Sequence, residues 1–514
     1  MKYDTIIVGA GSAGCVLANR LTEDPGKRVL LLEAGPRDTN VWIHVPLGYG
    51  KLFSRTDINW AYQSEPEPAL NGRRIFTPRG RVLGGSSSIN GLVYIRGQPE
   101  DYDGWGIPGW DFKALLPYFK KSENQARGPG EWHGVGGPFE VGDLERHELC
   151  DAFIDSAASL GFPRNPDFNG ARQEGTGYYQ ASTCRGRRCS TATGYLRQAE
   201  KRPNLSVEVN TLATKIVLDG RRATGVQIGD RVVSGGEIIL AGGAFNSPQL
   251  LQLSGIGPGA LLQRLGIPVV ADLPVGEGLQ DHFYARTFWR CKQPITLNDD
   301  LASLLRQARI GLQYILKRTG PLSIAAGYAA AFVRTRAELK RPDAQIYFIN
   351  FSSARRGGLL HPFSAFTCSV SQLQVESRGS VAIRSSDPRE APAIHYNYLA
   401  TENDRRVMVD GLKIARRIVN ARPLSDYMSA EEFPGPKVQT DDEWLAFVRE
   451  NGETVFHPTS TCSMGKVVDA DLRVKGIDRL RVVDASVMPA VPSGNINAAV
   501  IAVAEKAADL VKTA

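Results

Sequence analysis

The chain has 514 residues, of which 42% are hydrophobic and 22% charged, and its 61 basic and 54 acidic residues give a net charge of +7. This length predicts two or three domains, or one large domain that is interrupted by another. The basic residues form scattered pairs with no clustered stripe, so we expect no nucleic-acid partner.

The cysteines and the amino terminus indicate the cellular compartment of the protein. The seven cysteines are an odd number, and no pair of them has the spacing of zinc ligands, so we expect neither a disulfide framework nor a metal site. A reducing compartment fits best. A strand begins at residue 3 with no signal-peptide pattern before it, and no apolar run is long enough to span a bilayer. We therefore expect a cytoplasmic protein. Peripheral contact with the inner membrane and the oligomeric state are left open.

Four short apolar runs predict buried parallel strands. Each is rich in branched aliphatic residues and ends in glycine or in a carboxylate, as strands covered on both faces do. They are residues 5–8, 29–32, 237–240 and 480–483.

Residues 205–228 predict a small antiparallel meander laid over this sheet. They contain three strand-like pieces, and Asp219 and Gly220 form a hairpin-type turn between the last two.

The stretch from about 285 to 450 has another character. Residues 345–351 and 380–383 look like strands, and residues 407–419 carry apolar side chains at helical spacing. Strands followed by helices predict a separate α+β layer. Because the chain returns to the first sheet near residue 480, we expect a discontinuous, Rossmann-like α/β domain with a substrate-binding domain inserted, built on an antiparallel sheet with helices. The expected bounds are 1–150, 195–285 and 455–514 for the first domain, and 151–194 and 286–454 for the second.

The turn after the first strand matches the dinucleotide-binding pattern GxGxxG. Gly9 allows a tight turn, Gly11 lets a pyrophosphate approach the backbone, and Gly14 lets the helix pack on the strand. Glu33 ends the second strand, where a carboxylate can hold ribose hydroxyls. This pattern predicts a bound dinucleotide, and by itself it leaves FAD and NAD open.

Two longer motifs decide between these cofactors. Residues 80–90, followed by Tyr94, Gly97 and Asp103, resemble the first signature of the glucose-methanol-choline (GMC) oxidoreductases, and residues 243–257 resemble the second. The resemblance covers nearly the whole chain and is strongest to the choline-dehydrogenase-like and bacterial alcohol dehydrogenase branch. It implies FAD as the cofactor and makes the first domain an FAD-binding domain.

The resemblance also implies which residues contact the flavin. In choline oxidases the position of Ile89 is a histidine bonded covalently to the flavin, and isoleucine has no nucleophilic atom, so we expect non-covalent FAD. The expected contacts are Gly9, Gly11, Ser12, Ala13, Gly14, Glu33, Ala34, Val82, Ser86, Asn90, Gly91, Leu92, Val93, Ala213, Asp484, Ala485 and Asn497.

The catalytic pair comes from the resemblance as well. Oxidising an alcohol needs a base with a pKa near neutrality, and histidine suits this role, but residue chemistry alone does not choose among the seven histidines. The family motif implies His457 as the base, with hydride transfer to flavin N5, and Asn495 as the group that positions the substrate oxygen. His133 and His282 are interpreted as loop or core histidines. The expected substrate is a primary aliphatic or aromatic alcohol, and the electron acceptor is oxygen, a quinone or an electron-transfer protein.

Two other functions remain open. One is a non-redox enzyme on the same scaffold, such as a hydroxynitrile lyase or a photodecarboxylase. The other is a non-catalytic FAD-binding protein.

The final predicted element is a helix over residues 498–512. Asn495 or Asn497 is expected to cap its start, because asparagine side chains accept hydrogen bonds from free helix N–H groups. The amino end of this helix would then point toward the flavin.

Overall fold

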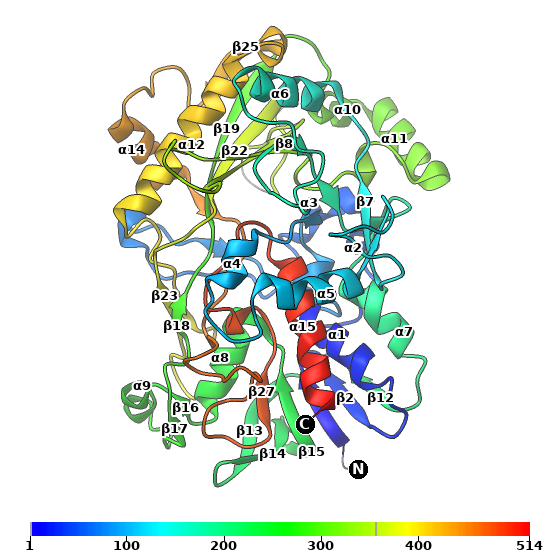
Figure 1. Cartoon of the computed structure of the whole chain (residues 1–514), viewed down its shortest axis with the longest axis vertical. Coiled ribbons are helices and arrows are strands. Elements are labelled where there is room, and N and C mark those ends of the chain that lie inside the picture. Colours follow the sequence, from blue (N-terminus) through cyan, green and yellow to red (C-terminus); the bar gives the residue numbers. More distant parts are fainter. Residues whose placement is uncertain (1–2, 355–356, 514) are drawn as a thin grey trace.

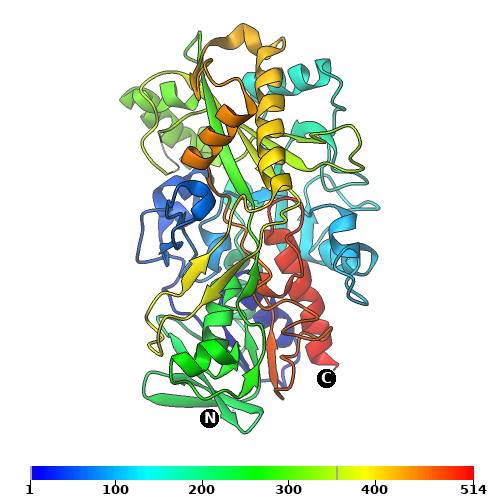
Figure 2. The same cartoon turned by 90° about the vertical axis from the view of Figure 1, so that its left-hand side faces the viewer.

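A computed structural model describes residues 3–354 and 357–513. Two seven-stranded sheets form the two halves of the molecule, one above the other in the views of Figures 1 and 2. No helix in the described part of the chain combines the length and the apolar character needed to cross a bilayer.

The lower sheet is mainly parallel and holds both ends of the chain. Its strand order is β12-β2-β1-β15-β14-β13, with β27 also paired to β15. The pairings β12/β2, β2/β1, β1/β15 and β15/β27 are parallel. The strands are β1 (Tyr3–Val8), β2 (Val29–Leu32), β12 (Leu205–Glu208), β13 (Ala213–Asp219), β14 (Arg222–Ile228), β15 (Arg231–Leu240) and β27 (Leu480–Val482).

One part of the predicted meander is wrong. Strand β12 does not join it but lies parallel to β2, with Leu205 opposite Val29 and Glu208 opposite Leu32. The antiparallel part consists of β13, β14 and the first half of β15. A four-residue strand carries no signal for its partner in its own sequence, which is why its pairing could not be predicted.

The upper sheet is antiparallel throughout and follows the order β25-β19-β22-β21-β20-β8, with β26 also paired to β19. Helix α12 (Glu402–Asn420) packs on it and begins five residues before the predicted start, where the Thr401 side chain accepts from the Asp404 N–H. The strands are β8 (Gly175–Tyr178), β19 (Phe283–Cys291), β20 (Ala329–Val333), β21 (Ala344–Ile349), β22 (Ala365–Gln372), β25 (Met428–Phe433) and β26 (Glu453–Thr454). The predicted fold class is confirmed.

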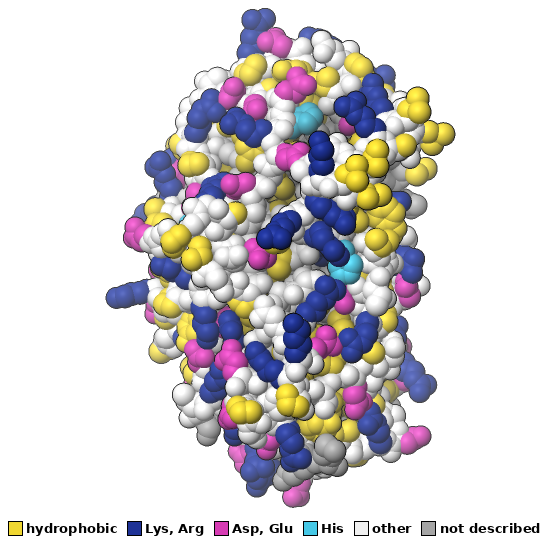
Figure 3. Space-filling view, turned by 90° about the vertical axis from the view of Figure 1, so that its right-hand side faces the viewer, with side chains coloured by type: hydrophobic (Ala, Val, Ile, Leu, Met, Phe, Trp, Pro, Cys, Tyr) yellow, Lys and Arg dark blue, Asp and Glu magenta, His cyan; other side chains and the backbone are white. Residues whose placement is uncertain are grey.

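Helix α11 (Leu304–Lys317) lies at the outer edge of the upper half. The space-filling view shows hydrophobic side chains protruding there (Figure 3).

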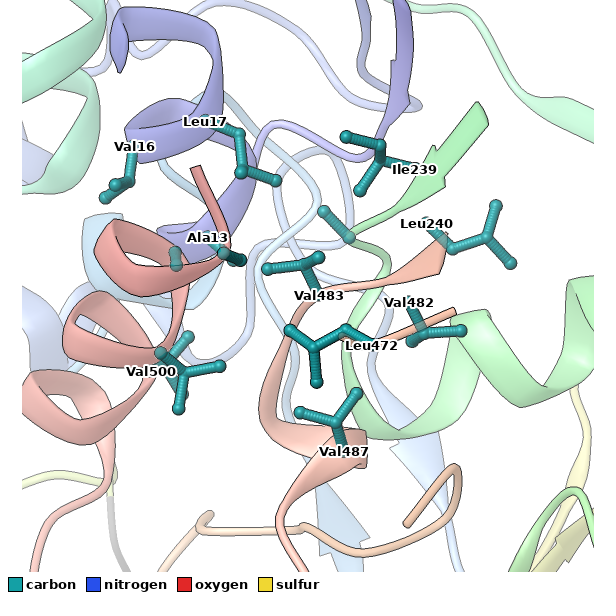
Figure 4. Close-up of a cluster of buried hydrophobic side chains, with 14 of the residues drawn as sticks. Ala13, Val16, Leu17, Ile239, Leu240, Leu472, Val482, Val483, Val487 and Val500 are labelled. Carbon is teal, nitrogen blue, oxygen red and sulfur yellow. The ribbon is translucent and has the colours of Figure 1, made fainter. Parts of the chain in front are cut away.

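The core of the lower half joins the two ends of the chain. Helix α1 (Ser12–Leu21) lies beside α15 (Asn497–Lys512), and both pack on the parallel sheet (Figures 1 and 4). Val16 and Leu17 from α1, Ile239 from β15 and Val482 from β27 are fully buried. Burying each such side chain contributes about 1.5–3 kcal/mol. This packing holds the start of both helices at the same edge of the sheet.

Candidate functional site

A large cavity opens where the two halves meet. Its volume is about 1480 Å³, above the roughly 300–1,000 Å³ of most small-molecule pockets. It therefore has room for a dinucleotide and a second small molecule together. Its wall includes the glycine turn after β1, the end of β2, the start of α15 and residues of the upper sheet.

Two positions of the glycine turn have no room for a side chain. Gly9 has φ +106°, and a Cβ there would lie 2.6 Å from the Ala241 carbonyl oxygen. A Cβ at Gly14 would lie 1.9 Å from the Gly9 carbonyl oxygen. Helix α1 then begins without a side-chain cap. The unbonded N–H groups of its first turn form a site suited to an anionic phosphate.

Glu33 stands at the end of β2 on the cavity wall. Its Oε2 accepts from the Ala10 N–H at 3.0 Å and its Oε1 from the Gly35 N–H at 2.8 Å. Burial raises the pKa of this carboxyl to about 7, and the two backbone N–H groups oppose that rise. Each carboxylate oxygen has a second lone pair, so the group can still accept from ribose hydroxyls.

The loop of residues 80–90 covers the glycine turn. A Cβ at Gly85 would lie 2.6 Å from the Gly11 Cα, so the two loops are in direct contact. Asn90 is fixed by Arg188, whose Nη1 donates to the Asn90 Oδ1 at 2.6 Å. Arg188 also donates from Nη1 to the Ser87 carbonyl at 3.1 Å, and burial lowers its pKa to about 9. The sequence interpretation did not include this buried arginine.

Val82 is placed differently from the other expected contacts. Its side chain is fully buried in a small apolar cluster with Ile43, Leu52, Ile58 and Ile89, and it does not line the cavity. Gly14 is also absent from the wall, in keeping with its packing role. The remaining expected residues all line the cavity: Gly9, Gly11, Ser12, Ala13, Glu33, Ala34, Ser86, Asn90, Gly91, Leu92, Val93, Ala213, Asp484, Ala485, Asn497, His457 and Asn495.

The backbone of His457 is held by a buried carboxylate. Its N–H donates to the Asp281 Oδ1 at 2.6 Å, while the Tyr398 and Thr454 hydroxyls donate to the Asp281 Oδ2. Burial raises the pKa of Asp281 to about 6, and the two hydroxyl donors lower it. This carboxylate therefore fixes the backbone of His457 at the cavity wall.

A chain of hydrogen bonds sets the protonation of both rings. The Nε2 of His282 lies 3.1 Å from the Leu373 carbonyl oxygen, which can only accept, so His282 donates there. Burial lowers the pKa of His282 to about 4, so the ring is neutral at pH 7 and its Nδ1 is an acceptor. That Nδ1 lies 3.0 Å from the Nδ1 of His457, which must therefore carry the proton. The Nε2 of His457 accepts from the Asn495 Nδ2, which can only donate, so its lone pair lies on that side.

Asn495 faces that lone pair. Its Nδ2 lies 3.1 Å from the Nε2 of His457, and its Oδ1 is a buried atom with no hydrogen-bond partner in the described structure. A buried acceptor without a partner marks a place where a ligand or water would complete the hydrogen bonding. His457 and Asn495 thus present a base and a polar amide at one point of the cavity wall.

His282 is the main site residue that the sequence interpretation missed. It is a core histidine, 1% exposed, as expected, but it also contacts His457 directly. Its position beside Asp281 was the available signal, since both members of this pair hold His457. His133 lies elsewhere, between the carboxylates of Glu123 and Asp167.

The expected cap of the last helix is wrong. Helix α15 begins at Asn497 and has no side-chain cap, because the Asn497 Oδ1 accepts instead from the Ser12 hydroxyl at 2.7 Å. This bond ties the starts of α1 and α15 together at the cavity wall. Both helices consequently keep unbonded N–H groups in their first turns, which suits a ligand with developing or permanent negative charge.

Comparison with known proteins identifies the family. Residues 3–284 and 375–504 match the profile of the GMC oxidoreductases. The chain belongs to the GMC oxidoreductase family. Members of this family bind FAD, and the cavity fits that cofactor: a Cβ is excluded from the glycine turn at Gly9 and Gly14, two uncapped helix starts face the cavity, and its volume exceeds that of one small ligand.

Relatives of this GMC oxidoreductase match it over its full length. Choline dehydrogenase from mouse mitochondria is 42% identical, with 99% of this chain and 89% of the relative covered. An alcohol dehydrogenase [acceptor] from Pseudomonas putida is also 42% identical, over 99% of this chain and 95% of the relative.

Solved structures agree on the fold. Pyridoxine 4-oxidase from Mesorbium loti has a TM-score of 0.89 at 31% identity, with 100% of this chain and 99% of that chain covered. A formate oxidase from Aspergillus oryzae has a TM-score of 0.92 at 27% identity, covering 100% and 98%. The protein is thus an FAD-dependent GMC oxidoreductase homologous to choline and alcohol dehydrogenases.

Proposed function

We propose that this protein oxidises an uncharged primary alcohol, aliphatic or aromatic, to a carbonyl compound, with His457 as the base. The observation that carries the proposal is the lone pair on the His457 Nε2, which the hydrogen-bond chain through His282 assigns to the side facing Asn495.

Four residues of the site have distinct roles in the proposed reaction. The substrate hydroxyl replaces the Asn495 Nδ2 as the donor to the His457 Nε2, which takes its proton as the carbon–hydrogen bond is broken. Asn495 hydrogen-bonds the substrate oxygen and holds the carbinol carbon in place. Bound FAD supplies the hydride acceptor. Asp281 holds the backbone of His457, and His282 holds its imidazole against rotation while the charge of the ring changes.

The upper wall of the cavity bears on the class of substrate. Tyr284, Tyr347 and Phe351 line it, and Arg286 is the only Lys, Arg, Asp or Glu among the described lining residues between 284 and 369. A quaternary ammonium group is usually held by aromatic faces together with a carboxylate. Arg286 is paired with Glu453 at 3.2 Å, and no carboxylate among the described residues of this wall is placed to hold a quaternary ammonium group, so uncharged alcohols are favoured over choline.

FAD is proposed to bind without a covalent bond at residue 89. Ile89 lines the cavity but offers no nucleophilic atom. The segments 1–150, 195–285 and 455–514 are proposed to hold the cofactor, and 151–194 and 286–454 the substrate. Acid precipitation tests for a covalent bond to the flavin. The yellow colour should stay in the supernatant, and colour in the pellet would contradict non-covalent binding.

An anaerobic screen of alcohols tests the reaction. Benzyl alcohol and 1-octanol should bleach the flavin absorbance, and choline should bleach it much more slowly. Readmission of air then separates an oxidase, which recovers its colour rapidly, from an enzyme that needs a quinone or a protein acceptor. A flavin that no alcohol bleaches, with no turnover of an artificial dye, would favour the non-redox or the non-catalytic alternative.

A further inference from the structure

The solvent side of helix α11 is unusually apolar. Leu304, Leu305 and Leu316 are 81%, 85% and 70% exposed, and Leu312 and Ile315 are also exposed. These five are among only twelve large hydrophobic side chains that are exposed in the described part of the chain, and they come from one 14-residue helix.

These side chains form one continuous stripe. At about 100° per residue, Leu304, Ile315, Leu312, Leu305 and Leu316 fall within an arc of about 120°. The two buried residues of the helix, Ile310 and Tyr314, lie on the opposite side and attach it to the body of the protein. About a third of the circumference of the helix is therefore both apolar and exposed to solvent, which an ordinary surface helix avoids.

The charges around the stripe are mostly positive. Arg306, Arg309 and Lys317 lie on α11 and Arg318 follows it, while the helix contains no acidic residue. The nearest carboxylates belong to α10 (Leu297–Ala302), where Asp300 pairs with Arg306 at 3.7 Å and Asp299 forms a capping box with Thr296. Glu145 lies beyond the other end, where it accepts from the Gly320 N–H. An apolar stripe bordered by cations is the pattern of helices that lie in the interface of an anionic membrane.

The stripe adjoins the mouth of the cavity. Gln307, Ile310 and Gly311 of α11 line the cavity, and so does Leu359, which is 91% exposed. A surface that covered the stripe would therefore also face the entrance to the proposed active site. The hydrophobic side chains that protrude at the upper right of Figure 3 belong to this region.

We propose that α11 docks the protein onto the surface of an anionic lipid bilayer, with its apolar stripe in the headgroup region and the cavity mouth facing the membrane. A second copy of the chain fits this stripe less well. In a symmetric dimer the same patch would meet itself, and the cations of the two α11 helices would be brought together. The docking does not depend on the reaction proposed above, although it would admit alcohols or electron acceptors that are dissolved in lipid.

Co-sedimentation of the FAD-loaded protein with vesicles tests this docking. The probes are vesicles of phosphatidylcholine alone and of phosphatidylcholine mixed with phosphatidylglycerol. The protein should sediment with the mixed vesicles and much less with the neutral ones, and added salt should release it. Absence from both pellets would overturn the proposal.

Matched variants locate the contact. The triple variant Leu305→Ser, Leu312→Ser, Leu316→Ser should weaken binding by at least about tenfold. Each substitution removes an apolar side chain that the bilayer would otherwise bury. The control triple Val135→Ser, Val232→Ser, Val269→Ser, on exposed sites elsewhere, should leave binding unchanged. Equal binding of the α11 triple variant and the unmodified protein would overturn the assignment to α11.

Charge variants test the bilayer against a protein partner. Arg309→Gln and Lys317→Gln should each weaken binding to mixed vesicles about fivefold, whereas Lys27→Gln and Lys201→Gln should not. Sedimentation velocity completes the test. A dimer that the α11 triple variant dissociates, together with no vesicle binding, would assign the stripe to a second copy and overturn the bilayer proposal.

Discussion

The pair of His457 and His282 shows how a buried neighbour can fix the chemistry of a catalytic candidate. Neither ring has a carboxylate on its other nitrogen; His282 instead donates to a backbone carbonyl and accepts from His457. Because His282 is buried and hard to protonate, its Nδ1 is an acceptor and requires the proton of His457 to be on Nδ1. The nitrogen that faces Asn495 is thereby the one that carries the lone pair.

Replacing the base tests its role directly. His457→Gln should slow anaerobic bleaching of the flavin by an alcohol on the order of 10²–10⁴-fold, because glutamine cannot take the proton. The ratio of flavin to protein absorbance should be unchanged. His395→Gln, at an exposed position on strand β24 (Ala393–His395), is the control. Bleaching at the original rate in His457→Gln would remove His457 from the mechanism.

Replacing His282 separates positioning from packing. His282→Leu fills the space but cannot accept from His457, so kcat should fall by about tenfold or more, with little change in KM and an altered pH profile. His282→Gln can accept from His457 and donate to the Leu373 carbonyl, so it should restore most of the rate. Equal losses in both variants would mean that His282 serves packing alone.

The lowered pKa of His282 predicts that the stability of the folded protein depends on pH. This pKa is lowered from 6.5 to about 4 in the folded protein, so the unfolded chain binds the proton first as pH falls. The contribution to stability is complete above pH 6.5 and is lost progressively between pH 6.5 and 4, by at most about 3 kcal/mol. Denaturant unfolding across this range should show the slope, and His282→Gln should reduce it. An identical slope in the variant would assign the effect to other groups.

The sequence predicted the role of His457 but not the contact that His282 makes with it. The family motif pointed to His457 and Asn495, but no local pattern reveals that a histidine 175 positions earlier meets the same ring. Arg188 was missed for the same reason, because its contact with Asn90 spans 98 positions. Contacts of this kind depend on how distant elements pack, which residue spacing does not encode.

At the scale of elements, the sequence was most informative where backbone geometry is demanding. The glycine turn was predictable because two of its positions, Gly9 and Gly14, have no room for a Cβ. The pairing of β12 and the missing cap of α15 were not predictable, because both depend on a partner element. At α15 the Asn497 side chain bonds to Ser12 in another helix instead of capping its own.

Gly14→Ala tests the packing of α1 on β1. The new Cβ would lie 1.9 Å from the Gly9 carbonyl oxygen, so the turn must shift, at a cost of about 1–3 kcal/mol or more. Both the midpoint of denaturant unfolding and the FAD content should fall. Gly130→Ala, where a Cβ meets nothing within 4 Å, is the matched control. A Gly14→Ala protein with full flavin content and unchanged midpoint would contradict this account of the turn.

At the scale of the whole molecule, the cavity wall is assembled from segments far apart in the chain. Gly11 and Glu33 come from the beginning, Ala213 from the meander, and Asp484 and Asn497 from the end, while the upper sheet closes the other side. A ligand in this cavity contacts all of these segments at once. Its binding energy is therefore coupled to the folding of the whole chain and not to one local element.

Removal and return of FAD should report this coupling. At a free FAD concentration of about 100 times its dissociation constant, mass action adds about 2.7 kcal/mol to the free energy of unfolding, provided that the unfolded chain does not bind it. The melting temperature of protein stripped of FAD should therefore rise with the logarithm of added FAD, as followed by differential scanning calorimetry. FMN lacks the adenosine half that the Glu33 and Ala213 side of the cavity is expected to hold, so it should stabilise much less. Because every segment of the wall contributes to the bound state, a melting temperature that does not respond to saturating FAD would contradict the assignment of this cavity to the cofactor.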